Sequence, residues 1–470
     1  MEKRYFKSQL ISLVFQAVLY LLIFASFFLL QAVTNPQIIG YSRTAAITMA
    51  TFAVILILLT HVYGGYRLGT RKARPVFFAI LISVVLTDIV TYVQLQIMNV
   101  NPANNPRLIL FGEDFVLLCA TILIQTSVIY LFVRLGDFLY FKINPPERCC
   151  IIAASQEQAD HIAEKIGSFS KKYQLCDVLH YHCDDIYDTI MEYDVVFLSG
   201  IPDTEEAAIE TFCYKQGKTM YLAAELEDVI ISSSAQVVID DTPFLYTDRA
   251  DPSLVQRFLK RLMDIVFSIL GIVLLSPAMI AAAVIIKCSD GGPVFFKQKR
   301  ATLNGNVFTI IKFRTMSAQE QPYPHQSATT NDERVTKVGR LLRRLRIDEF
   351  PQLFNVFLGD MSIVGPRPEM LENVDRYTRD VPEFEYRQKM KAGITGLAQI
   401  DGKYNTSPKD KVMLDLMYIH RFSLALDIKL MLRTVTVFFR PDSAEGFHTQ
   451  KKPGALKMRI RPKTDRKQET

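Results

Sequence analysis

The sequence predicts a membrane protein built from an α-helical four-span bundle (1–140), a Rossmann-like α/β domain (148–246) and a mainly α domain (255–440) that contains a re-entrant membrane helix. Three observations predict this fold class. The 470 residues are too many for one ordinary core. Hydrophobic residues make up 49% and charged residues 22% of the chain, and the long apolar runs gather in its first third. This mixture excludes a disordered chain and indicates both membrane-embedded and water-exposed parts.

Four apolar runs, at 9–32, 44–64, 75–98 and 115–133, predict the bundle. Each has about 20 residues, enough to cross about 30 Å of hydrocarbon as a helix. The first run is too long for a signal peptide and lacks a small-x-small cleavage site, so we expect it to stay in the protein. Basic residues before the first run and between the second and third runs place both segments in the cytoplasm.

Short apolar runs alternate with polar, helix-like segments from about 148 to 246, which is typical of a small α/β domain with a largely parallel sheet. The expected strands lie at 149–153, 194–200, 219–223 and 236–239. After the first strand, Ala153-Ala154-Ser155 stands where a Rossmann site has glycines that let the backbone approach a pyrophosphate. The domain is therefore predicted to be of a degenerate nucleotide-binding type, and a structural or interaction role is favoured over nucleotide binding.

A fifth apolar run covers 265–286, within a predicted membrane helix at 264–287, and Ser276-Pro277 interrupts the run at its centre. Proline removes a backbone donor and bends a helix, while a neighbouring serine can satisfy the freed carbonyl. Basic residues lie on both sides of the run, so both of its ends are expected in the cytoplasm. We predict a re-entrant helix–break–helix that enters and leaves by one face; a true fifth span is the alternative.

Cationic side chains concentrate after this run. The alternation in 308–316 puts Lys312 and Arg314 on one side of an extended segment, where two cations suit a diphosphate. A solvated strand face explains the same pattern. Residues 336–346 predict an amphipathic basic helix, suited to an anionic membrane surface or to packing on its own domain.

An acidic pair, Asp348-Glu349, follows directly. Asp as N-cap, Glu in the first turn and Pro351 soon after predict a helix start. Adjacent carboxylates can also share Mg²⁺, and one of them can attack phosphorus. Further along, Arg367 stands between Pro366 and Pro368, whose rigid backbone can aim one guanidinium at a phosphate or a carboxylate.

Six blocks, in order, resemble the bacterial sugar transferase family, the monotopic polyprenyl-phosphate glycosyl-1-phosphate transferases. The blocks read KRLMD (260–264), SP (276–277), KFRTM (312–316), IDEFPQL (347–353), SIVGPRP (362–368) and GITGLAQ (393–399). The four spans and the α/β domain upstream are similar to those of the long members of the family, so the resemblance extends over nearly the whole chain.

The resemblance implies a multi-pass protein of the bacterial inner (cytoplasmic) membrane with its catalytic domain on the cytoplasmic face. It implies transfer of a hexose-1-phosphate from a UDP-sugar to undecaprenyl phosphate with release of UMP, initiating exopolysaccharide, capsule or O-antigen synthesis. Asp348 would be the nucleophile that forms a covalent phosphosugar intermediate, and Asp348 and Glu349 would hold Mg²⁺. The implied substrate-binding residues are Lys312, Arg314, Arg343, Arg367, Arg300 and Gln399, and Ser276 and Pro277 would keep the membrane helix re-entrant.

Two alternatives stay open on the sequence. One is a direct ternary-complex transferase in which Asp348 only binds metal; the other is a catalytically silent membrane scaffold or regulator of a polysaccharide assembly complex. Membrane lipid and a second copy of the chain are further expected partners, and nucleic acid is not, because the basic residues follow membrane edges. The motifs do not separate glucose, galactose and N-acetylated sugars. The tail at 441–470 is basic and is expected to be mobile or to touch the membrane.

Overall fold

The chain divides into two compact units in a computed structural model. The model describes residues 2–66, 69–100, 110–247, 251–317, 334–402, 406–437 and 457–459, with the side chains of 2–9, 290 and 437 left aside. Unit 1 comprises Met1–Ala223 and Gln450–Thr470, and unit 2 comprises Ala224–Thr449. Apart from 457–459, the predicted basic tail at 441–470 lies outside the described residues.

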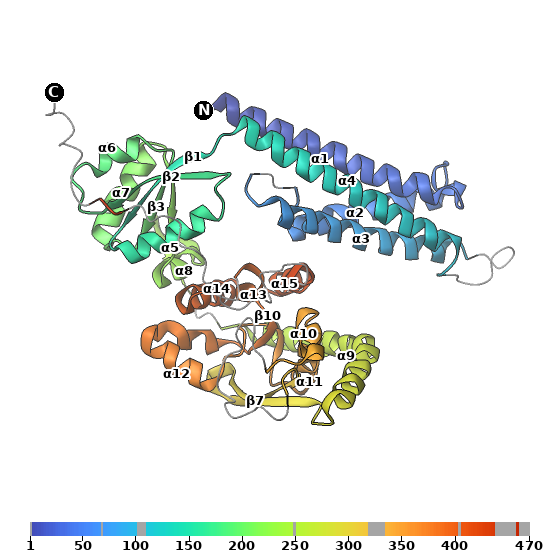
Figure 1. The fold of residues 1–470 in the computed structure, drawn as a ribbon. Helices are drawn as coiled ribbons and strands as arrows, with labels where there is room; N and C mark the ends of the chain where they lie inside the picture. Colours follow the sequence, from blue (N-terminus) through green and yellow to red (C-terminus); the bar gives the residue numbers. More distant parts are fainter. Residues whose placement is uncertain are drawn as a thin grey trace. The chain divides into compact units, whose positions relative to one another are not determined.

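Unit 1 begins with four long helices, α1 (Glu2–Gln31), α2 (Arg43–Tyr63), α3 (Ala73–Met98) and α4 (Glu113–Ile143), with the short turn η1 (Pro36–Ile38) after α1. They lie side by side (Figure 1), around a core that includes Phe27, Phe52 and Ile129. Their outer faces are apolar too, since Leu21 and Leu123 are 66% and 69% exposed. Apolar residues on both faces suit a lipid environment better than water.

Five helices among the described residues are long and apolar enough to cross a membrane: these four and α9 (Leu254–Asp290) of unit 2. The apolar helices therefore fit a membrane protein, as the sequence predicts. The four-span count and the orientation of the bundle stay predictions.

The second part of unit 1 is a parallel four-stranded sheet with strand order β2-β1-β3-β4 (Figure 1). Its strands are β1 (Glu147–Ala153), β2 (Tyr173–His180), β3 (Val195–Ser199) and β4 (Thr219–Leu222), and its helices are α5 (Gln156–Gly167), α6 (Ile186–Met191) and α7 (Asp203–Lys215). Alternate residues of β1 enter two cores: Cys149 and Ile151 pack with α5, and Cys150 and Ile152 pack with α6 and α7. The predicted α/β domain is confirmed as a sheet covered on both faces.

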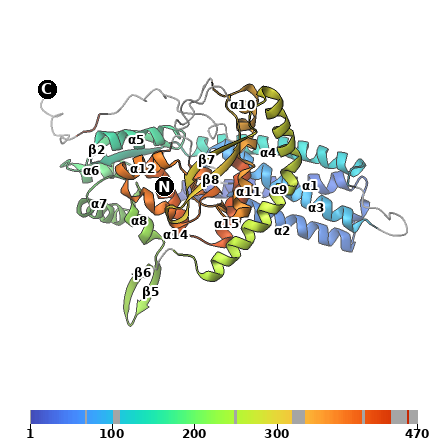
Figure 2. The ribbon, with the colours of Figure 1, turned by 90° about the horizontal axis from the view of Figure 1, so that it is seen from below.

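One strand was not predicted and one strand prediction needs correction. The segment Tyr173–His180 is strand β2, which the sequence hides because β2 lies at the edge of the sheet and carries polar residues such as Gln174 and Asp177 among its apolar ones. The run at 236–239 does not join the parallel sheet. It lies in β5 (Ala235–Ile239), which pairs antiparallel with β6 (Thr242–Tyr246) in a separate, fully exposed hairpin of unit 2 (Figure 2).

A short piece of the C-terminal segment also belongs to this sheet. Arg459 forms a parallel bridge with Leu179 of β2, and backbone hydrogen bonds join Arg459 to Val178 and His180. The Arg459 guanidinium pairs with Asp177 at 3.3 Å and with Asp185 at 3.1 Å. Met458 packs with the core on the α5 side. Residues 457–459 therefore extend the sheet beyond β2.

The turn that lacks the Rossmann glycines is filled by side chains. Ser155 caps α5 by accepting a hydrogen bond from the Gln158 backbone N–H at 3.3 Å. Gly200, directly after β3, has φ +64, and a Cβ there would lie 2.0 Å from Nε2 of Gln158. The Gln158 side chain thus occupies space next to the ends of β1 and β3, where doubly wound folds bind nucleotides. The degenerate nucleotide-binding type of the domain stays a prediction.

Unit 2 is mainly α-helical, as predicted. Its helices besides α9 are α8 (Leu226–Ser232), α10 (Lys337–Arg344), α11 (Gln352–Leu358), α12 (Leu371–Asp380), α13 (Leu397–Asp401), α14 (Pro408–His420) and α15 (Leu424–Val437). Besides the β5–β6 hairpin, unit 2 contains the antiparallel hairpin β7 (Phe295–Ala301) and β8 (Val307–Phe313) and the parallel pair β9 (Ser362–Val364) and β10 (Gly393–Thr395). Its 3₁₀ turns are η2 (Leu303–Gly305), η3 (Ile347–Glu349) and η4 (Pro382–Lys389). Contacts assign α8 to this unit, upstream of the domain start predicted at 255.

Helix α9 is continuous through Ser276-Pro277 and changes direction along its length, as Figures 1 and 2 both show. Proline at 277 cannot donate to the carbonyl of Val273, four residues earlier. The Ser276 hydroxyl donates to that carbonyl instead, at 2.7 Å. The predicted interruption is therefore a site inside one helix where a side chain replaces a backbone donor. The re-entrant topology stays a prediction.

The first turns of α9 connect to two other segments of unit 2. Arg261 donates to the carbonyls of Val356 and Phe357, at 2.7 and 2.8 Å, and so caps the C-terminal end of α11. Asp264 accepts hydrogen bonds from the Ser362 hydroxyl and the Ile363 N–H, both at 2.9 Å. These contacts fix the positions of α11 and β9, which follow each other in the chain, relative to α9.

Candidate active site

The acidic pair Asp348-Glu349 lies in the turn η3, between α10 and α11. Arg346 begins this turn with φ +54, a left-handed conformation that sends the chain sharply out of α10. Ile347 and Phe350 pack into an apolar cluster with the second half of α9. The predicted N-cap role of Asp348 is wrong, because α11 begins at Gln352 with Pro351 at the cap position. Neither carboxylate is used in capping that helix.

Glu349 is surrounded by cations. Its Oε1 lies 2.7 Å from the Arg367 guanidinium and 3.2 Å from Nζ of Lys312, and its Oε2 lies 3.7 Å from the Arg346 guanidinium. Burial alone would raise the pKa of Glu349, but these three cations outweigh it and hold the pKa well below its usual range. Glu349 is therefore ionised and neutralised by its neighbours.

Asp348 is in a different state although it is the next residue. Its side chain makes no hydrogen bond or ion pair within the described part of the chain. Burial and the negative charge of Glu349 raise the pKa of Asp348 to about 6, against the opposing effect of Lys312, Arg343 and Arg367. One carboxylate of the pair is thus fixed by ion pairs, and the other is available for chemistry.

Three predicted phosphate-binding residues gather around this pair. Lys312 comes from β8 and Arg367 from the loop after β9, and both contact Glu349 directly. Arg343, on α10, donates to the Thr315 hydroxyl at 2.9 Å and acts electrostatically on Asp348. Burial lowers the pKa of Lys312, which Glu349 partly restores. Carboxylates and cations at this density fit the binding of a phosphorylated ligand.

The other predicted site residues have different surroundings. Arg300, on β7, is half-buried and donates to the Pro368 carbonyl at 3.3 Å, next to Arg367. Its burial lowers its pKa to about 10. Arg314 follows the end of β8 and packs against Gly292, where a Cβ would lie 1.9 Å from its guanidinium nitrogen. Arg314 is not among the main causes of the pKa shifts of the acidic pair. Its role beside Lys312 in binding a diphosphate stays a prediction.

Gln399 lies on α13, against Gly396. Both polar atoms of its amide are buried and make no hydrogen bond with the described residues. No described contact joins Gln399 to the acidic pair. Its role in substrate binding stays a prediction.

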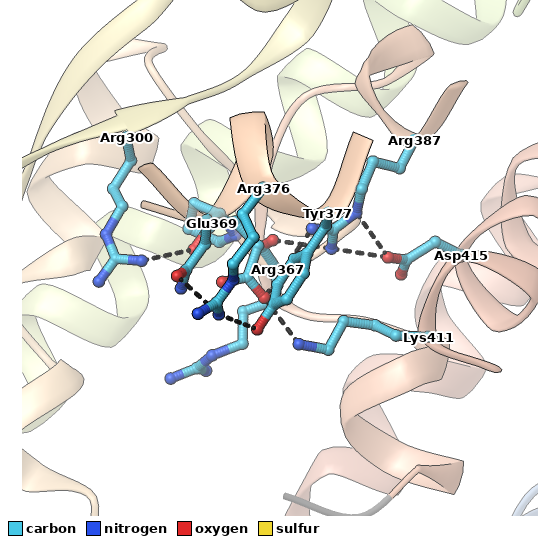
Figure 3. A network of polar contacts seen from close by, with 10 residues as sticks. Arg300, Arg367, Glu369, Arg376, Tyr377, Arg387, Lys411 and Asp415 are labelled. Atoms are coloured by element: carbon cyan, nitrogen blue, oxygen red, sulfur yellow. Dashed lines mark hydrogen bonds and ion pairs between the residues drawn. The ribbon is translucent and has the colours of Figure 1, made fainter. Parts of the chain in front are cut away.

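Two features of the site are not predicted by the sequence: Arg346 and a buried network behind Arg367. The basic helix was expected to reach residue 346, but α10 ends at Arg344, and Arg346 turns back towards Glu349. The network contains Arg387, Asp415, Glu369 and Lys411 (Figure 3). No sequence pattern joins residues from η4 and α14 to the Arg367 loop, since their ion pairs are set by the tertiary fold.

The carboxylates of the acidic pair fit a Mg²⁺ ion that also binds phosphate oxygens of a substrate. No group of three or more His, Cys, Asp or Glu side chains suited to a metal occurs among the described residues. Mg²⁺ needs only one or two carboxylates when substrate phosphates supply further oxygens. Glu349 and Asp348, which has no ion pair among the described residues, are the two carboxylates in place.

Comparisons with known proteins cover the part of the chain that contains this site. The profile of a family described as bacterial sugar transferase matches residues 255–441. Over 187 residues the chain is 43% identical to the UDP-N-acetylgalactosamine-undecaprenyl-phosphate N-acetylgalactosaminephosphotransferase of Aeromonas hydrophila, covering 39% of this chain and 44% of that protein. Over 190 residues it is 40% identical to the UDP-glucose:undecaprenyl-phosphate glucose-1-phosphate transferase of Caulobacter vibrioides, covering 39% of this chain and 71% of that protein.

The protein of the same name from Escherichia coli is 43% identical over 186 residues, with 38% of this chain and 40% of that protein covered. The chain therefore aligns with less than half the length of the Aeromonas and Escherichia relatives and with 71% of the Caulobacter relative. All three names describe transfer of a sugar phosphate to undecaprenyl phosphate.

Proposed function

The chain belongs to the bacterial sugar transferase family, and we propose that it transfers a hexose-1-phosphate from a UDP-sugar to a polyprenyl phosphate such as undecaprenyl phosphate, with release of UMP. One observation carries the proposal. Glu349 is neutralised by Lys312, Arg346 and Arg367, whereas Asp348 beside it has no ion pair with any residue that the structure describes. An unpaired carboxylate among cations is the arrangement that nucleophilic attack on a phosphate requires.

In the first step, a carboxylate oxygen of Asp348 attacks the phosphorus that carries the sugar. The bond from this phosphorus to the bridging oxygen breaks, and UMP leaves with that oxygen and its electron pair. The sugar phosphate is then bound to Asp348 as an acyl phosphate. Lys312, Arg343 and Arg367 neutralise the charge that would otherwise repel the attacking carboxylate.

In the second step, a phosphate oxygen of the polyprenyl phosphate attacks the same phosphorus. The bond to Asp348 breaks, which regenerates the carboxylate and leaves a polyprenyl diphosphate sugar. Asp348 and Glu349 would hold Mg²⁺, which when bound would neutralise charge on the diphosphate. The ion pairs of Glu349 would keep this carboxylate ionised and in place throughout.

The raised pKa of Asp348 predicts a loss of activity on the acid side. With a pKa of about 6, about nine-tenths of the carboxylate is ionised at pH 7 and about one-tenth at pH 5. We expect the rate of UMP release, measured without lipid acceptor to isolate the first step, to fall about tenfold per pH unit below 6. Glu349→Gln removes a negative charge that raises the pKa of Asp348. The residual activity of this variant should therefore decline at a lower pH than the activity of the wild type. An identical acid limb in both proteins would contradict the assignment.

We further propose that the enzyme works at the cytoplasmic face of the bacterial inner membrane, with α9 re-entrant. The outward residues Leu274 and Ile280 support contact of α9 with lipid, since both are highly exposed and apolar. Leu341 and Leu345 on and beside α10 are exposed as well, next to Arg340 and Arg344. Such a basic amphipathic helix would bring the acidic pair close to the surface where a lipid phosphate is presented.

Cysteine labelling tests the topology of α9. In a background with Cys119 and Cys288 replaced by serine, Ser253→Cys and Ser289→Cys are expected to react with a membrane-impermeant maleimide only after spheroplasts are permeabilised. Lys142→Cys is the matched control for the same side, and Tyr41→Cys, in the highly exposed loop after α1, should react in intact spheroplasts. Labelling of positions 253 and 289 from opposite sides would make α9 a fifth span.

A substrate panel tests the proposed function itself. Membranes that contain the protein are incubated with undecaprenyl phosphate and UDP-glucose, UDP-galactose, UDP-N-acetylglucosamine or UDP-N-acetylgalactosamine, and UMP is measured. At least one UDP-sugar should give UMP and a lipid-linked sugar in amounts that depend on the acceptor. Membranes without the protein are the control. Absence of UMP with all four sugars would instead favour the catalytically silent scaffold.

A further inference from the structure

The backbone of the loop that carries Arg367 is held by buried cationic side chains. The loop runs from Val364, at the end of β9, to Pro368. The Arg367 side chain donates to Glu349 at 2.7 Å. The Val364 carbonyl accepts a hydrogen bond from Lys260 at 3.0 Å, and the Arg367 carbonyl accepts one from Arg387 at 2.9 Å. Charged donors thus hold the backbone on both sides of the one side chain that faces the acidic pair.

Arg387 acts through two nitrogens of its guanidinium, Nε and Nη2. It donates to one Asp415 carboxylate oxygen through two nitrogens, at 3.0 and 2.7 Å, and to the Arg367 carbonyl (Figure 3). The Arg387 and Asp415 side chains are only 4% and 1% exposed. Glu369, two residues after Arg367, lies 3.9 Å from Arg387 and pairs with Lys411 at 2.7 Å. At this burial Arg387 cannot touch a substrate; it touches the backbone of a residue that can.

Lys260 has the equivalent arrangement at the other end of the loop. Its ammonium lies 2.6 Å from Asp427, and Tyr418 donates to the same carboxylate at 2.7 Å. Lys260 belongs to the first turns of α9, so this contact connects the membrane-associated helix to the Arg367 loop. At each end of the loop, a backbone carbonyl therefore accepts a hydrogen bond from a cationic side chain. A buried carboxylate neutralises the charge of each of these two cations.

We propose that the Arg387–Asp415 and Lys260–Asp427 pairs are positioning pairs, which fix the Arg367 backbone so that its guanidinium meets Glu349 and the substrate phosphates. Buried ion pairs contribute little net stability compared with apolar side chains of the same size, so stability alone does not explain two of them here. A need for accurate positioning explains these pairs better, because a displacement of about 1 Å in a phosphate-binding group can lower the rate about a hundredfold. The catalytic part of this inference rests on the proposed function.

A double-mutant cycle tests whether Arg387 acts through Arg367. Arg387→Lys keeps the positive charge beside Asp415 but removes the forked donor. We expect it to lower kcat/KM for UMP release about tenfold in the wild-type background and less than about twofold in Arg367→Ala. Arg433→Lys is the matched control, since Arg433 pairs with Asp401 on α13 and does not contact the loop. Equal losses from Arg387→Lys in both backgrounds would overturn the proposal.

Hydrogen exchange supplies a readout that needs no activity. The Gly365 N–H donates to the Thr395 carbonyl at 2.8 Å, and the Pro366 carbonyl accepts from the Gly393 N–H at 2.8 Å. In the full-length protein, a peptide covering 362–370 should exchange faster in Arg387→Lys than in wild type or in Arg433→Lys. Asp415→Asn gives the same test if Arg387→Lys does not fold. If no UDP-sugar supports turnover, the proposed function fails while faster exchange still supports the positioning of the loop; unchanged exchange overturns it.

Discussion

Asp348→Asn is expected to abolish UMP release, with a loss of at least about a thousandfold. The amide has the size of the carboxylate but cannot attack phosphorus. Because Asp348 makes no ion pair with the described residues, the substitution removes chemistry without breaking a structural contact. The measurement is UMP release from membranes with matched amounts of protein. Asp375→Asn, on the exposed face of α12, is the control and should retain full activity.

The same variant separates the two transferase mechanisms. With a UDP-sugar labelled in the phosphate that carries the sugar and no lipid acceptor, denatured wild-type protein should retain label, and Asp348→Asn should retain none. A direct ternary-complex transferase would release UMP only when the acceptor is present and would trap no label. UMP release by Asp348→Asn at the wild-type rate would rule out the nucleophile.

Glu349→Gln is expected to lower kcat/KM about a hundredfold and to raise the Mg²⁺ concentration for half-maximal activity at least about tenfold. The neutral amide is a poorer ligand for Mg²⁺. It also leaves Lys312, Arg346 and Arg367 without their common carboxylate. Breaking a buried charge network destabilises a protein as well, so the Mg²⁺ titration of UMP release is paired with a thermal unfolding curve.

Glu349→Asp provides the matched control for that experiment. It keeps the charge and shortens the side chain by one methylene, so we expect a Mg²⁺ requirement between those of the wild type and Glu349→Gln. If Glu349→Gln has the Mg²⁺ dependence of the wild type, Glu349 only organises the cations around it. The metal would then be held by Asp348 and substrate.

The sequence motifs anticipated the composition of the site better than its geometry. Membership of the sugar transferase family is confirmed, and Lys312, Arg343 and Arg367 gather around the acidic pair as the motifs indicated. The prediction that Asp348 caps a helix was wrong because Pro351 stands at the cap position of α11. Arg346 could not be placed because its contact depends on a left-handed turn, which a non-glycine residue seldom adopts.

Long-range features were outside the reach of local patterns. Periodicity identified the apolar helices and most of the α/β domain, since burial on one or both faces leaves a regular trace. Strand β2 was missed because an edge strand can be polar. The contact of Arg387 with the Arg367 carbonyl joins residues 20 positions apart, and that of Lys260 with Val364 joins residues 104 positions apart. Neither separation has a periodicity that sequence reasoning could detect.

Residues 457–459 pair with β2, so this part of the C-terminal segment belongs to a folded domain. Unit 2 is inserted within unit 1, because the chain leaves the α/β sheet after β4 and contributes to it again at Arg459. A truncation before residue 457 would therefore remove part of a folded sheet rather than a dispensable tail. It would uncover the β2 edge, a template for aggregation, and leave Asp177 and Asp185 without Arg459. Affinity tags that replace this segment carry the same risk.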